Sequence, residues 1–112
     1  MSGNLVYKKS KTIKTNSNPR AVKTPKQMER HLKGVANHRR IEILFLVARE
    51  GGISVEGIAD SLKCNFKTIS VHIGKLTQAG LIEKRYEGRL VKHSLTPYGR
   101  IFISFLTTFQ HS

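Results

Sequence analysis

The segment HRRIEILFLVAREGG, residues 38–52, constrains the fold more than any other part of the chain. Ile41, Leu44, Phe45 and Ala48 recur at helical spacing, and the apolar residues between them widen the stripe that they form. A helix that is apolar over so much of its surface is expected to lie at the centre of a core. The rest of the chain must therefore supply elements that pack around this helix.

Four further helices are indicated by apolar residues at helical spacing, within residues 27–36, 55–63, 66–79 and 97–112. Asn37 and Ser54 are good N-caps for the helices that follow them, and Gly51-Gly52 should stop the central helix. Gly34 is expected to weaken the end of the first helix, because glycine lowers helix propensity.

Two β-like runs, LIEKRYE and RLVKHSLT, separate the last two helices. They are joined around Glu87-Gly88, where glycine supplies the positive φ of a hairpin turn. The sequence therefore predicts a mainly α fold with a small β-hairpin, in the order α-α-α-α-β-β-α. This is a winged helix-turn-helix layout, expected to occupy residues 27–112.

Residues 1–26 are rich in lysine and arginine, contain no acid, and have little apolar material to bury. We expect a disordered basic arm, which is either a solvated tail without a function or a segment that binds along a polyanion. The whole chain has 20 Lys and Arg against 7 Asp and Glu, a formal charge of +13. This excess favours a nucleic acid, an acidic protein or an anionic membrane surface as partner.

The helix within residues 66–79 has a free face that carries Lys67, Thr68, Ser70 and Lys75 and no acid. Such side chains can donate hydrogen bonds to base edges and phosphates. Basic residues also surround the tip of the hairpin, where long side chains reach phosphates. Since two elements and the arm are all basic, a polyanionic partner is the favoured interpretation.

Several blocks in this order resemble ArsR-like winged-helix transcriptional repressors, with MarR-like proteins as the wider superfamily. They are LKGVANHRRIEIL (32–44), ISVEGIADSL (53–62), KTISVHIGKLTQAGLIEKR (67–85) and EGRLVKHSLT (87–96). The resemblance implies a homodimer that reads a palindromic site in double-stranded DNA and acts as a repressor. One recognition helix per subunit would enter the major groove, and the hairpin wing would touch the flanking backbone or minor groove.

The DNA-contacting side chains implied by this resemblance come from the recognition helix and the wing. They are Asn65, Lys67, Thr68, Ser70, Val71, His72 and Lys75 in the helix, and Lys84, Arg85 and Arg89 in the wing.

Four positions of the recognition helix need separate comment. Phe66 either presses on thymine methyls or continues the apolar series into the core, and the core placement is favoured. Val71 stands where the resemblance leads us to expect an arginine on the DNA face. Gly74 either permits a close approach of the helix backbone to DNA or is a tolerated sequence change without a function. His72 either has a functional role, as structural support or as a phosphate contact, or is an ordinary half-buried histidine.

The terminal helix has more apolar surface than one face against the core can cover, and Ile103 and Leu106 widen its stripe. Leaving several phenylalanines in water is costly, so pairing with a second copy is expected. The predicted dimer interface consists of Met28, Leu32, Ile101, Phe102, Phe105 and Phe109.

No catalytic or metal-binding pattern is present, so we expect neither an enzyme nor a cofactor. Cys64, the one cysteine, is interpreted as a buried inert thiol, with a redox switch as the alternative. Without a signal peptide or a membrane span, the cytoplasm is the expected location. The alternatives to a sequence-specific regulator are a winged helix that docks on a protein and a nonspecific nucleic-acid-binding protein.

Overall fold

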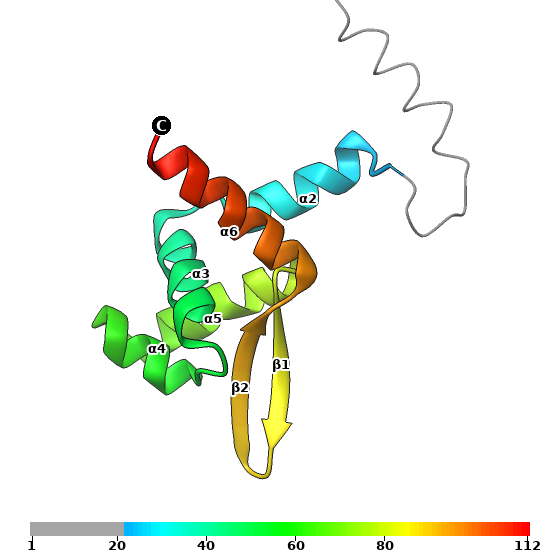
Figure 1. Ribbon diagram of the computed structural model, residues 1–112. Helices are drawn as coiled ribbons and strands as arrows, with labels where there is room; N and C mark the ends of the chain where they lie inside the picture. The colour runs from blue at the N-terminus through cyan, green and yellow to red at the C-terminus, as the bar shows by residue number, and fades with distance from the viewer. Residues whose placement is uncertain (1–21) are drawn as a thin grey trace, which may run out of the picture.

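The computed structural model describes residues 22–112, which form five helices and a two-stranded antiparallel sheet (Figure 1). The elements are α2 (Pro25–Val35), α3 (His38–Glu50), α4 (Val55–Leu62), α5 (Phe66–Gln78), β1 (Ile82–Glu87), β2 (Leu90–Leu95) and α6 (Pro97–Gln110). This order confirms the predicted winged helix-turn-helix. Within the described part of the chain, no helix is long and apolar enough to cross a membrane.

The predicted basic arm falls mostly on residues 1–21, which lie outside the described residues. Helix α2 begins at Pro25, two residues before the expected start of the domain at Gln27. The reason is a capping box: the Thr24 hydroxyl accepts from the Gln27 amide at 3.2 Å, and the Gln27 side chain accepts from the Thr24 amide at 2.8 Å.

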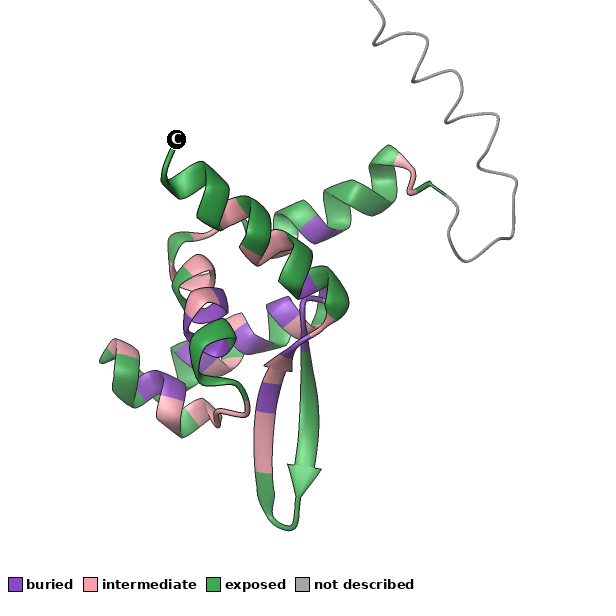
Figure 2. Cartoon of the chain, viewed as in Figure 1, coloured by how far each residue is buried: buried purple, intermediate pink, exposed green. Residues whose placement is uncertain are grey.

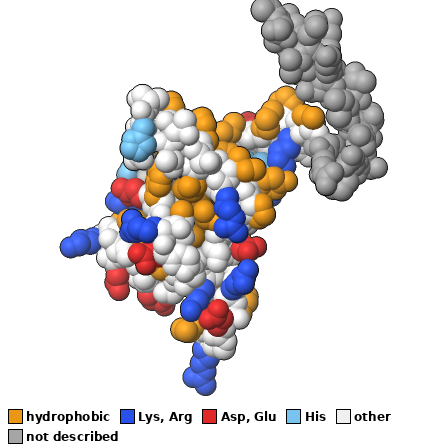
Figure 3. Space-filling view, in the orientation of Figure 1, with side chains coloured by type: hydrophobic (Ala, Val, Ile, Leu, Met, Phe, Trp, Pro, Cys, Tyr) orange, Lys and Arg blue, Asp and Glu red, His pale blue; other side chains and the backbone are white. Residues whose placement is uncertain are grey.

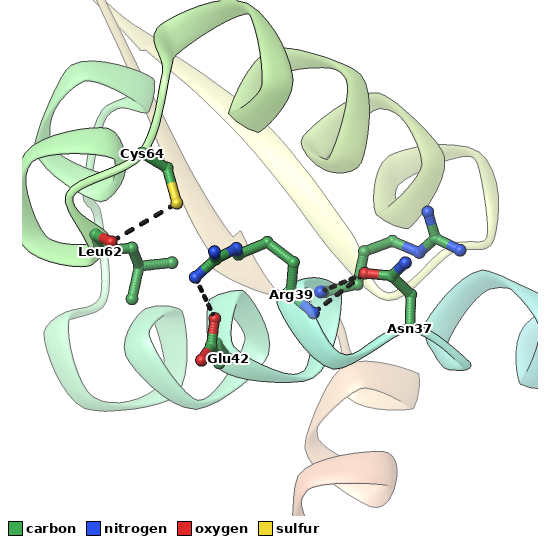
Figure 4. Close-up of polar contacts among 6 residues, drawn as sticks. Asn37, Arg39, Glu42, Leu62 and Cys64 are labelled. Atoms are coloured by element: carbon green, nitrogen blue, oxygen red, sulfur yellow. Dashed lines mark hydrogen bonds and ion pairs between the residues drawn. The ribbon is translucent and has the colours of Figure 1, made fainter.

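Side-chain caps set the starts of the other helices. The Asn37 carboxamide accepts from the amides of Arg39 and Arg40 at 3.0 and 3.1 Å (Figure 4). Ser54 accepts from the Gly57 amide at 3.1 Å. These hydrogen bonds confirm both predicted N-caps. The caps were predictable because a capping signal is local and needs no knowledge of the tertiary fold.

Helix α3 lies at the centre of the core, as its sequence predicts, and packs against α5, α6 and β2 (Figure 2). The face that it buries differs from the expected stripe. Ile43, Leu44, Leu46 and Val47 are at most 2% exposed. Ala48 is exposed, because so many consecutive positions of this helix are apolar that spacing alone does not fix which of them face inward.

Helix α2 packs against the end of α5 through a contact that only glycine allows. A Cβ on Gly34 would overlap the Cβ of Ala79. Next to this contact, His31 Nδ1 donates to the Ala79 carbonyl at 2.5 Å, and Arg30 donates to the Gln78 carbonyl at 2.7 Å. Helix α2 ends at Val35, one residue after Gly34, and the missing side chain of Gly34 has a further role that the sequence did not predict, because it lets α2 lie against α5.

The hairpin is joined to the rest of the domain at its base. β1 and β2 pair from Ile82↔Leu95 to Glu87↔Leu90, and Gly88 has a φ of 63°, which confirms the predicted turn. His93 in β2 is 1% exposed and pairs with Ile53, in the loop between α3 and α4. This bridge fixes the direction in which the wing projects.

Candidate nucleic-acid interface

Helix α5 buries one side and presents the other to solvent. Ile69, Ile73 and Leu76 are at most 2% exposed and pack in the core. The 3.6-residue period places Lys67 and Val71 on the opposite side, and both are exposed. The sequence of α5 contains no acid, so its outward face is free of carboxylates.

The remaining predicted residues of α5 surround this outward face. Thr68 and Lys75 are exposed, whereas Ser70 and His72 are half-buried at its edges. Asn65 caps the helix, with its side-chain oxygen accepting from the amides of Lys67 and Thr68 at 2.7 and 3.3 Å. The amide nitrogen of Asn65 can still donate to a ligand in front of the helix start.

A groove of about 600 Å³ separates α5 from the wing. Phe66 and Ser70 of α5 line one side, and Lys84, Arg89 and Leu90 of the hairpin line the other. Gly74 of α5 and Glu56 of α4 also line this groove, which is therefore apolar along part of its length, basic at the wing and acidic at α4.

Phe66 does not lie in the core. It is 49% exposed, so the favoured core placement was wrong. Phe66 is the first residue of α5, one turn before Ile69, where the buried side of the helix begins. At that end the neighbouring elements leave its ring against the groove instead of covering it.

The three predicted wing cations lie in different surroundings. Lys84 pairs with His93 in the strand register, on the face of the hairpin that lines the groove. Arg85 points to the other face, 3.8 Å from the Glu83 carboxylate, and Arg89 lies in the turn. Among residues 22–112, the ion pairs of the hairpin engage Arg85 and Lys92 but neither Lys84 nor Arg89.

A cluster of cations adjoins His72 on one side of α5. Arg40 Nη1 donates to His72 Nδ1 at 3.3 Å, and Arg40 Nε is buried without a hydrogen-bond partner among the described residues. Burial lowers the pKa of His72 below its ordinary value, and repulsion from Arg40, Arg39, His38 and Lys75 lowers it further. An anion beside this cluster would relieve the repulsion.

Sequence reasoning missed this cluster. The Arg39-Arg40 pair is visible in the chain, but its closeness to His72 depends on how α3 packs against α5. The N-cap Asn37 was a usable signal, since it fixes where the first turn of α3 presents these arginines.

Most of the predicted interface residues of α2 and α6 are exposed apolar side chains. The exposed fraction lies between 45% and 64% for five of them, which are Met28, Leu32, Ile101, Phe105 and Phe109. The rings of Phe105 and Phe109 stack with centroids 5.7 Å apart. Figure 3 shows hydrophobic side chains gathered on this side of the molecule.

Phe102, Ile103 and Leu106 lie differently, because they are partly buried against the core. Ile103 and Leu106 therefore do not widen the exposed stripe, contrary to expectation. Phe102 still lines a shallow apolar pocket of about 250 Å³, together with Leu32, Ile101 and Phe105. The apolar surface is thus continuous from α2 to α6.

Within residues 22–112, no three His, Cys, Asp or Glu side chains gather as they would around a metal ion. Cys64 is half-buried instead of buried, and its thiol donates to the Leu62 carbonyl at 3.4 Å (Figure 4). Nothing in this contact activates the sulfur.

Comparison with known proteins shows that this chain is similar to transcriptional regulators. A family model described as HVO_A0114 matches residues 26–103. A cadmium resistance transcriptional regulatory protein, a CadC homologue of Staphylococcus aureus, is 28% identical over 75 residues. The arsenic resistance transcriptional regulator ArsR1 of Pseudomonas putida is 32% identical over 65 residues. These matches cover 67% and 58% of this chain, and 62% and 51% of the length of those relatives.

Solved structures agree on the fold. The homodimeric winged helix-turn-helix DNA-binding domain of Mb0332 from Mycobacterium bovis, a possible ArsR-family transcriptional regulator, is 32% identical with a TM-score of 0.69. That match covers 76% of this chain and 80% of that one. Reduced HlyU from Vibrio cholerae is 26% identical with a TM-score of 0.66, over 74% of this chain and 87% of that one.

Proposed function

Because the chain belongs to the HVO_A0114 family and is an ArsR-like winged helix-turn-helix protein, we propose that it binds double-stranded DNA as a homodimer and represses transcription. The observation that carries this proposal is the acid-free outward face of α5 beside the wing cations Lys84 and Arg89, which no ion pair within residues 22–112 engages. A protein with this role would act in the cytoplasm, where it meets the chromosome.

In this proposal α5 enters the major groove, which is wide enough for one helix. Lys67, Thr68 and Ser70 donate to base edges or nearby phosphates, and Asn65 donates at the start of the helix. His72 and Lys75 face the flanking backbone, where the Arg40 cluster also attracts phosphate. The wing contributes phosphate contacts through Lys84, Arg85 and Arg89, and residues 1–26 add sequence-independent affinity through their charge.

The apolar surface of α2 and α6 supports the dimer. Pairing that surface with itself in a second copy would remove several half-exposed apolar side chains from water. It would also set two recognition helices about one turn of DNA apart, the spacing that palindromic half-sites need. The Mycobacterium bovis relative is described as homodimeric, which favours the same assembly here.

The test begins with selection of DNA from a random pool, followed by affinity measurements at one salt concentration. The selected duplex, a scrambled duplex and an RNA hairpin are compared by fluorescence anisotropy. We expect the selected duplex to bind at least about 10³-fold more tightly than the scrambled one. Equal affinities would favour nonspecific binding, and no affinity for any of the three would favour a protein-docking domain.

Single substitutions separate the two classes of contact. Arg89→Ala should weaken binding to the selected and scrambled duplexes alike, with a salt dependence shallower by about 0.9 in the slope of log K against log salt. Thr68→Ala should change the preferred sequence instead. Arg100→Ala is the matched control, because it removes the same charge from α6, outside α5 and the wing.

A further inference from the structure

Gly74 is a helix-interior glycine that no contact among residues 22–112 explains. At the helical glycines Gly34, Gly57 and Gly99, an added Cβ would collide with a neighbouring residue. At Gly74 it would meet nothing within 4 Å, and Gly74 is not among the glycines with positive φ. Alanine would stabilise the helix at this position, so neither packing nor backbone conformation accounts for the glycine.

Gly74 lies on the outward side of α5, one turn after Val71. These two residues are three positions apart, so they are neighbours on the helix surface. Val71 is 57% exposed, although it is apolar. Along the same side, Lys67 precedes Val71 and Gln78 follows Gly74. The side chains in the middle of the outward face are therefore short and apolar, whereas those at its two ends are long and polar.

We propose that Val71 and Gly74 form the base-reading centre of α5 and recognise the 5-methyl group of a thymine in the major groove. This inference rests on the proposed DNA-binding function and adds the base that is read. Thymine is the base that presents an apolar group on the major-groove floor. The methyl groups of Val71 have no donor or acceptor to offer, so they match that group and no other base edge.

Gly74 supplies the depth that this contact needs. A valine reaches only a short distance from the helix axis, so the backbone must come close to the base edge. Without a Cβ at Gly74, the surface of the helix is lowest one turn after Val71. The exposed Lys67 lies at the N-terminal end of this strip and Lys75 lies beside it, and both side chains are long enough to reach phosphates.

Phe66 does not provide the same contact. Phe66 and Gly74 line the same groove beside the wing, but Phe66 is the first residue of α5, about two turns before Gly74. Its aromatic surface thus belongs to the edge of the interface.

Replacing thymine with deoxyuridine tests the proposal, because this change removes only the methyl group. In the duplex selected from a random pool, each thymine is replaced in turn. We expect one position in each half-site to lose about fourfold in affinity, the effect of one buried methyl group. With Val71→Ala, the same replacement should change affinity less than twofold. Thr107→Ala, which truncates an exposed β-branched side chain of α6, outside α5 and the wing, is the control and should keep the fourfold effect.

Gly74→Ala gives a second, independent readout. It should raise the melting temperature by about 4–8 °C, since alanine favours the helix. It should weaken binding to the selected duplex about tenfold, because the new methyl group holds the helix away from the bases. Opposite signs for stability and binding exclude misfolding as the cause.

The results that would overturn the inference are specific. It fails if no thymine replacement is less costly in Val71→Ala than in the unsubstituted protein, or if Gly74→Ala binds the selected duplex as tightly as that protein. It also fails if the selected sites share no thymine, and in all three cases the proposed DNA-binding function stands. If the selection enriches no duplex at all, the proposed function fails as well.

Discussion

Phe105→Asp is the perturbation that most directly tests the proposed dimer surface. The ring of Phe105 is 56% exposed in the protomer and stacks on Phe109. A phenylalanine buries about 150–250 Å² in a core or an interface, so roughly 100 Å² remains for a partner to cover. At about 25 cal/mol per Å², this surface contributes about 2.5 kcal/mol per copy.

A symmetric dimer contains the side chain twice, so the substitution should cost about 5 kcal/mol of association free energy. This corresponds to a rise of roughly 10³–10⁴-fold in the dissociation constant. The introduced carboxylates would add repulsion across the interface. The folded protomer should change little, because the position is already more than half exposed.

Sedimentation at micromolar protein measures the outcome, with circular dichroism to confirm that helix content is kept. Thr107→Asp is the matched control, because it places the same charge on an exposed position of α6 away from the Phe105 stripe. The unsubstituted protein and the control should sediment as dimers and Phe105→Asp as a folded monomer. A dimer that survives Phe105→Asp unchanged would refute the assignment of this surface.

Three further predictions concern the fold and the interface. Gly34→Ala should lower the free energy of unfolding by about 1–3 kcal/mol, and by less in an Ala79→Gly background, as measured by urea denaturation. Because the pKa of His72 is lowered in the folded state, the unfolded state takes up this proton first as the pH falls. The free energy of unfolding should therefore decrease below about pH 6.5, and His72→Gln should flatten that part of a pH series of urea titrations. Lys84→Ala should make the salt dependence of duplex binding shallower by more than Arg85→Ala does, because Arg85 is ion-paired with a neighbouring acid; anisotropy over a salt series would compare them.

The fold was predictable where the signal is local. Asn37 and Ser54 cap helices through their own side chains, and Gly88 makes the hairpin turn, so each could be found from a few adjacent residues. The order of elements then identified the winged helix-turn-helix. The start of α2 was missed by two residues, although the Thr24–Gln27 capping box was present in the sequence.

Features that depend on distant parts of the chain were not predictable in this way. Phe66 continues the apolar spacing of α5, yet the tertiary fold leaves it uncovered. Gly34 looked like a weakness of α2 because its partner, Ala79, is far away in the sequence. The proximity of His72 to Arg40 likewise arises only when α3 and α5 pack. Periodicity finds the faces of an element, whereas the neighbour of each face is set by the whole fold.

The proposal that two copies place two α5 helices on one duplex is tested most directly by the selected DNA itself, analysed together with the mass of its complex. We expect a palindrome whose half-site centres are about 10 base pairs apart, bound by two protomers. A single half-site bound by one protomer, with no palindrome among the selected sequences, would contradict the account.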